Sequence, residues 1–239
     1  MNTIQRPIAD RHYIVQKVGL AFYARSAWGV LRKDLTCELR ARHALSAVLL
    51  FAVTSTVAVS ITANAWGGDA AVSSALLWLV IYFSAMSGLS RAFVHEEESC
   101  TSATLKLVAR PNAVYLGKTI FIWLLLTAME TVTVPLFVLL MGCKVANWGA
   151  LVGILLLGGL GLSLGAAMAA AMVARATVKG TLFAVICFPL LMPALVSAVH
   201  GSSMAIGGGS AASDLRLLAY YCATVFIASL ILFRFIWED

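Results

Sequence analysis

The chain has 239 residues, of which 61% are apolar and only 12% are charged, and its formal net charge is +6. With a mean hydropathy of +0.92, it has too little polar surface to cover the core of a soluble domain. Its basic residues flank apolar stretches, which indicates membrane topology and excludes nucleic acid as the partner.

Long apolar stretches predict an all-α membrane protein with six transmembrane helices. Crossing about 30 Å of hydrocarbon takes roughly 20 residues, and only helices or closed barrels satisfy the backbone there. The stretches are continuous and rich in Leu and Ala, unlike the alternating strands of barrels. We expect a cytoplasmic tail at residues 1–22 and a transmembrane domain at 23–239, with spans at 45–65, 72–90, 120–141, 148–174, 181–199 and 217–233.

Before the first span, residues 25–42 predict an amphipathic helix. Apolar residues recur at spacings of three and four, and most basic residues lie off this stripe. The stripe consists of Trp28, Leu31, Leu35 and Leu39. Such a helix is suited to the membrane interface, in contact with lipid. The alternative is a helix packed on another protein surface.

The positions of Lys and Arg predict the orientation. Of the 17 basic residues, all but Lys144 and Arg216 fall on one side of the predicted spans. Cytoplasmic connections carry the excess of positive charge. We therefore expect a multi-pass protein of the bacterial inner membrane with both termini in the cytoplasm.

The connection between spans two and three, residues 91–118, is then cytoplasmic. It combines basic, aromatic and acidic residues with an apolar run, and it is where a transport motor could push on the spans. The candidate contact residues are Arg91, Phe93, Glu96, Glu97 and Glu98. The alternative is a solvated loop with local ion pairs.

No catalytic motif is present in the sequence. Gly117-Lys118-Thr119 resembles the end of a phosphate-binding loop, but the glycine required five positions earlier is Asn112. There is no HExxH or GxSxG motif, and the five cysteines are scattered singly, without the pairs of a zinc site. We expect a non-catalytic chain without a metal site, whose ATP hydrolysis belongs to a separate subunit.

Glu130 lies near the middle of the third predicted span, where a charged carboxylate costs a few kcal/mol. One interpretation is that it lines a path or moves with a conformational change. The other is that it is protonated, or hydrogen-bonded to nearby Thr or Ser, and only fixes packing. Pro135 removes a backbone donor from the same helix and predicts a bend.

Spans four and five carry further special residues. Pro189 and Pro193 predict a kink in span five. Gly161 and Gly165 form a small-xxx-small pair that allows close helix packing, either within the chain or with a second copy. His200, at the far end of span five, is a candidate ligand for a metal or haem iron, although a lone histidine there is more often an interfacial polar residue.

From about residue 28 to 237 the chain resembles the B subunit of the haem exporter of cytochrome c maturation, CcmB, an ABC transporter membrane subunit. Six short pieces occur in the family's order. They are Leu31–Leu35, Glu38–Arg40, Arg91 with Phe93 and Glu96–Glu98, Tyr115–Lys118, Glu130 with Pro135, and Phe188–Leu191 with Pro193.

The resemblance implies a six-span subunit that pairs with a second copy of itself and with a separate ATPase, CcmA. It also implies partnership with CcmC and CcmD, and a role in haem delivery to the periplasmic chaperone CcmE for c-type cytochrome biogenesis. Haem would be the cargo, ATP would bind the partner, and the acidic residues of the 91–118 segment would dock the ATPase. The alternatives are a non-transporting scaffold of the haem-handling complex and an ABC exporter subunit for another cargo.

Overall fold

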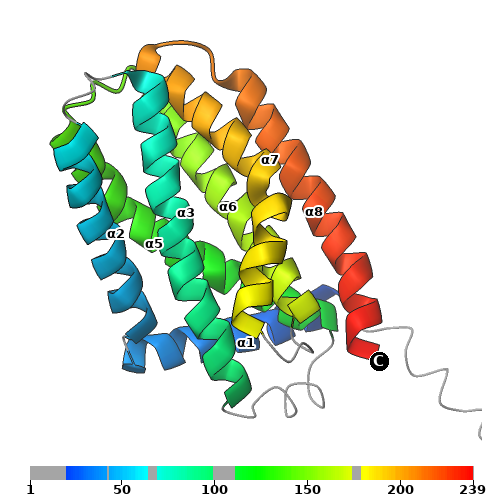
Figure 1. Ribbon diagram of the computed structural model, residues 1–239. Helices are drawn as coiled ribbons and strands as arrows, with labels where there is room; N and C mark the ends of the chain where they lie inside the picture. The colour runs from blue at the N-terminus through cyan, green and yellow to red at the C-terminus, as the bar shows by residue number, and fades with distance from the viewer. Residues whose placement is uncertain (1–19, 42, 64–68, 99–110, 174–178, 239) are drawn as a thin grey trace, which may run out of the picture.

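The computed structural model describes residues 20–41, 43–63, 69–98, 111–173 and 179–238, and every element of regular structure in these ranges is an α-helix (Figure 1). The helices are α1 (Leu20–Ala41), α2 (His43–Ala63), α3 (Ala70–Glu98), α5 (Pro111–Met141), α6 (Trp148–Val173), α7 (Lys179–Gly207) and α8 (Ala212–Glu238). All except α1 are long and apolar enough to cross a membrane, which confirms the six-span prediction.

Several helices extend beyond the predicted spans. The apolar part of α5 alone is 30 residues, Asn112–Met141, or about 45 Å at 1.5 Å per residue, against a hydrocarbon core of about 30 Å. α3 likewise continues past residue 90 to Glu98. The hydropathy pattern marks where a helix leaves the apolar layer, whereas the helix itself ends where its backbone is capped or broken. Both ends of the predicted 91–118 loop, residues 91–98 and 111–118, are therefore helical.

α5 and α7 end at the same side of the bundle, and each is terminated by a glycine. Gly142 and Gly208 have φ of 63° and 84°, and α5 and α7 end directly before them. In each case the next residue donates its N–H back to the helix, from Gly209 to the Met204 carbonyl at 2.8 Å and from Cys143 to Val138 at 3.2 Å. This is the Schellman cap, which needs a left-handed residue that glycine adopts without strain.

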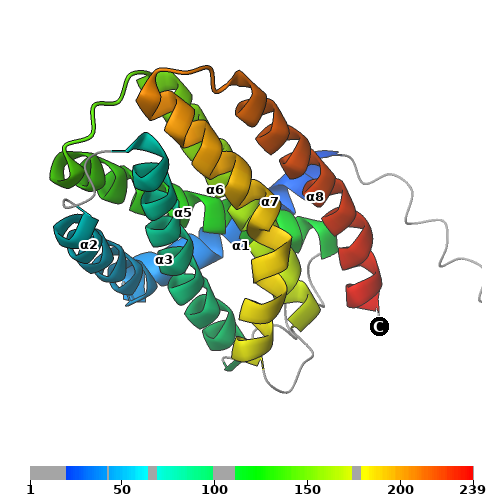
Figure 2. The ribbon, with the colours of Figure 1, turned by 45° about the horizontal axis from the view of Figure 1, so that its top comes forward.

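α6 lies at the centre of the bundle and packs against α5, α7 and α8 (Figure 2). Its glycines allow this approach. A Cβ on Gly161 would lie 3.2 Å from Tyr221 of α8, and one on Gly165 would lie 2.3 Å from Leu191 of α7. The predicted small-xxx-small pair thus packs on helices of the same chain. The largest fully buried side chains include Trp78, Phe137, Leu126, Met129, Leu151, Ile154, Leu162 and Leu191.

α1 does not run with the bundle but lies across one end of it, where it packs on α5 (Figure 1). Its Ala27, Val30 and Leu31 are buried, whereas Trp28 is 64% exposed and Leu35 41%. The predicted apolar stripe is therefore divided, with Leu31 against the bundle and Trp28 and Leu35 facing outward. Those outward side chains suit the predicted contact with lipid at the interface.

Candidate functional site

Glu130 is buried in the middle of the bundle, with only 4% of its surface exposed. Its Oε1 has no hydrogen-bond partner among the described residues. The carboxyl group fits beside α6 because residue 159 is glycine, where a Cβ would lie 3.1 Å from Oε1. The Thr133 hydroxyl, one turn further along α5, is also buried without a partner among these residues. Buried polar groups without a hydrogen-bond partner are costly and rare in native proteins.

The neighbouring glycine of α6 receives an aromatic ring. A Cβ on Gly158 would lie 2.3 Å from Cη2 of Trp78, which is 1% exposed. The Trp78 indole N–H donates to Ser202 Oγ at 2.8 Å and so links α3 to α7 across the core. Gly158 and Gly159 thus accept Trp78 from α3 and Glu130 from α5. In the interior, the hydrogen-bonded Trp78 ring and the Glu130 carboxyl group, whose Oε1 has no partner among the described residues, therefore pack against neighbouring positions of α6.

The first half of α5 is hydrogen-bonded to α6. The Tyr115 hydroxyl donates to the Leu164 carbonyl at 3.3 Å, and the Trp123 indole N–H donates to the Leu156 carbonyl at 3.1 Å. Because both partners are backbone carbonyls, a movement of the base of α5 would have to move α6 or break these bonds.

The base of α5 meets α1 at Gly117. A Cβ there would lie 2.9 Å from both the Ala27 carbonyl oxygen and the Val30 Cβ. The two helices approach closely at Gly117, which gives this glycine a packing role in place of the rejected phosphate-loop role. α1, the start of α5 and the end of α3 lie at the same end of the molecule (Figure 1).

The proposed motor contacts form the last two turns of α3. Arg91, Phe93, Glu96, Glu97 and Glu98 belong to this helix, but their side chains lie outside the described part of the structure. Residues 99–110, which follow them in the predicted coupling loop, also lie outside it.

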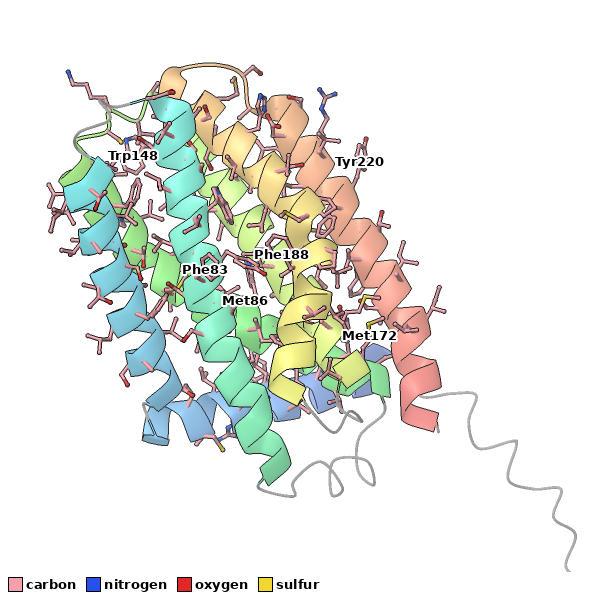
Figure 3. All side chains as sticks on the ribbon, in the orientation of Figure 1. Phe83, Met86, Trp148, Met172, Phe188 and Tyr220 are labelled. Carbon is pink, nitrogen blue, oxygen red and sulfur yellow. The ribbon has the colours of Figure 1, made fainter. Side chains whose placement is uncertain are left out.

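The three prolines sit inside continuous helices, Pro135 in α5 and Pro189 and Pro193 in α7. In both ribbon views α7 changes direction about halfway along (Figures 1 and 2), and Phe188, adjacent to Pro189, lies in this region (Figure 3). Phe188 stacks edge-on against Tyr82 of α3, with ring centroids 6.2 Å apart. The change of direction is therefore packed against α3.

His200 lies at the opposite end of the bundle from α1, near the end of α7. Its Nδ1 lies 2.9 Å from Oδ1 of Asp214, in the first turn of α8. Asp214 is buried at 4% exposure. His200 is thus one member of a pair and not an isolated histidine.

Sequence reasoning missed Trp78, Ser202 and Asp214. Trp78 had a usable signal, because it lies in mid-span and not at the interface where Trp is enriched. Asp214 also had one, as an acid at the start of an apolar run. No sequence signal pairs either residue with its partner on α7, since the separations are 124 and 14 residues.

Comparison with known proteins gives one clear result. The profile of the family described as CcmB protein matches residues 25–236, nearly the whole chain. A search of curated proteins finds no match. The match begins within α1 and includes all six membrane-spanning helices. The chain belongs to the CcmB family, whose members are the membrane component of the haem-export ABC system of cytochrome c biogenesis.

Proposed function

We propose that this chain is the membrane subunit that converts ATP hydrolysis by a separate subunit, CcmA, into movement of the helix bundle during haem delivery to the chaperone CcmE. It works as a pair of identical copies together with CcmC and CcmD, in the bacterial inner membrane with both termini in the cytoplasm. The chain itself has no catalytic residue, and haem is handled as cargo.

The observation that carries this proposal is the contact of α1 with the base of α5 at Gly117. α1 lies across the end of the bundle where α3 ends and α5 begins, so a partner that contacts residues 91–98 meets α1 and α5 at the same end. Movement of such a partner would act on α1 and α5, which are already in contact.

The hydrogen bonds between α5 and α6 would transmit a movement of α5 to the interior of the bundle. Tyr115 and Trp123 tie α5 to backbone carbonyls of α6, and Glu130 lies further along α5 against Gly159. A displacement of α5 therefore changes the surroundings of the Glu130 carboxyl group, whose Oε1 has no hydrogen-bond partner among the described residues. We assign Glu130 a role in this movement.

Charge reversal tests the docking role. In cells that also express the ATPase subunit, we expect the Glu96→Lys, Glu97→Lys, Glu98→Lys variant to lose association on the order of tenfold, about 1.4 kcal/mol, because like charges are costly at an interface. A Lys144→Glu, Arg216→Glu variant is the control, since it alters charge at the opposite end. The measurements are the ratio of co-purified ATPase and the level of c-type cytochromes in a deletion strain. If ATP hydrolysis by the partner still supports cytochrome maturation in full in the triple variant, the docking role is overturned.

Inactivation of the ATPase site distinguishes a motor subunit from a scaffold. A transporter subunit loses cytochrome maturation when its partner cannot hydrolyse ATP, whereas a scaffold retains it. Normal c-type cytochromes in a strain that lacks this chain would instead indicate another cargo.

A further inference from the structure

The His200–Asp214 pair has a distinctive division of exposure. The imidazole is 60% exposed, whereas the carboxylate, 2.9 Å from Nδ1, is 6% exposed. Because Nδ1 faces the buried carboxylate, the opposite ring nitrogen, Nε2, points away from it. The buried carboxylate therefore holds Nδ1 in place, and Nε2 of the same imidazole faces outward.

The position of Asp214 is built into the fold. It lies in the first turn of α8, where the helix dipole favours a carboxylate. Residue 201 of α7 is glycine, and a Cβ there would lie 2.8 Å from the Asp214 Cβ. The Ser213 hydroxyl lies 3.5 Å from the second carboxylate oxygen. A side chain on residue 201 would therefore displace the Asp214 side chain from its present position.

This arrangement matches that of histidines that bind metals. A ligating histidine commonly donates its other ring N–H to a carboxylate, which fixes the tautomer and raises the basicity of the ligating nitrogen. When the Asp214 carboxylate accepts a hydrogen bond from Nδ1–H, the free lone pair of the imidazole lies on Nε2. The pair needs only an incoming metal to become such a site.

The number of donors indicates which metal. A free zinc ion bound to protein takes three or four protein ligands, whereas haem iron already has four porphyrin nitrogens and is held by one or two axial ligands. Val196, one turn before His200 on the same helix face, is 65% exposed and apolar. An imidazole beside an apolar side chain fits the iron and the flat apolar ring of haem.

We propose that His200 is an axial ligand of haem iron at the end of the bundle opposite α1, and that Asp214 is its positioning residue. The identity of the ligand rests on the proposed function in haem delivery. The iron–nitrogen bond forms at Nε2, while Nδ1–H donates a hydrogen bond to the Asp214 carboxylate, which sets the donor strength of the ring.

Haem titration of the full chain in lipid nanodiscs tests the ligand. We expect haem to give the sharp absorption band of an imidazole complex, and we expect His200→Gln to weaken binding at least about tenfold and to remove that band. Gln can still donate to Asp214, so loss of the band with an unchanged unfolding temperature separates ligation from a structural role. His43→Gln, at the other end of the bundle, is the control. An unchanged band in His200→Gln overturns the proposal.

Two further measurements cover a variant that folds poorly. In His200→Gly, added imidazole is expected to restore the band, and failure of this rescue in a folded variant counts against the proposal. In Asp214→Asn, the iron–histidine stretching band of reduced haem is expected to shift to lower frequency, because the ring loses its anionic acceptor. An unshifted band overturns the role of Asp214. Full ATPase coupling with no haem band would refute this site while leaving the proposed function intact.

Discussion

At the scale of single residues, two adjacent glycines of α6 decide what the interior can hold. Gly158 leaves room for the Trp78 ring, and Gly159 leaves room for the Glu130 carboxyl group. Protein interiors are close-packed, so even one added methyl group must displace a neighbour. The rigid ring and the polar group therefore depend on the absence of two side chains.

Gly158→Ala tests this dependence. The added Cβ would lie 2.3 Å from the Trp78 ring, and we expect a loss of about 1–3 kcal/mol in the free energy of unfolding. Trp78→Phe alone also destabilises, because the buried Ser202 hydroxyl loses its donor at a cost of about 1–3 kcal/mol. Since Phe lacks the clashing atoms, the double variant should be more stable than the two losses predict. Strict additivity in denaturant unfolding would contradict the contact.

Glu130→Gln tests whether the buried carboxyl group does more than fill space. Gln has nearly the same shape but cannot ionise, so a role in movement predicts lower ATPase coupling and lower cytochrome maturation with unchanged stability. Gly159→Ala is the companion change, since its Cβ would press on Oε1 at 3.1 Å. If Glu130→Gln leaves both activities unchanged, only a packing role remains for the residue.

At the scale of elements, α5 connects the two ends of the molecule. Its apolar part is longer than the hydrocarbon core is thick, so its first turns reach α1 while its middle carries Glu130. A helix transmits displacement along its axis because each turn is hydrogen-bonded to the next. Under the proposed function, the interface between α1 and α5 is where movement of the ATPase would be passed to the bundle.

Gly117→Ala tests that interface. The new Cβ would meet the backbone oxygen of Ala27 at 2.9 Å, and we expect α1 to shift with a loss of about 1–3 kcal/mol in stability and reduced ATPase coupling. Gly29→Ala is the matched control on α1, because a Cβ there has nothing within 4 Å and Ala favours the helix. Coupling and stability should therefore fall only in Gly117→Ala. Equal effects of the two variants would show that α1 tolerates movement at this contact.

At the scale of the whole molecule, charge divides the bundle into two ends. Lys144 follows α5 and Arg216 lies in the second turn of α8, both at the end opposite α1, while α1 alone carries Arg25, Arg32, Lys33 and Arg40. Positive charge accumulates on the cytoplasmic side of membrane proteins. The α1 end is therefore predicted to face the cytoplasm.

Labelling of single cysteines in a variant without native cysteines tests this orientation. A membrane-impermeant thiol reagent added to intact spheroplasts should modify Lys144→Cys but not Ser102→Cys until the membrane is permeabilised. The positive-inside bias gives the reason. Labelling of Ser102→Cys from the outside would refute both the orientation and the motor contact.

The sequence alone determined the fold class, the six spans and the kind of protein. These follow from hydropathy and local spacing, because each span must satisfy its own backbone within lipid whatever lies beside it. Glu130 was recognisable for the same reason, as a carboxyl group in a stretch that must be apolar. The family resemblance agrees with the profile match over residues 25–236.

Only the tertiary structure decided which residues meet. Trp78 and Ser202 are 124 positions apart, and Gly117 touches α1 at Ala27 and Val30. Several helices, such as α3 and α7, also continue beyond the predicted spans, since a helix stops at its cap and not at the edge of the lipid. Contacts between helices depend on how they are rotated and offset in the bundle, and helical periodicity in one segment carries no information about the rotation of its neighbours.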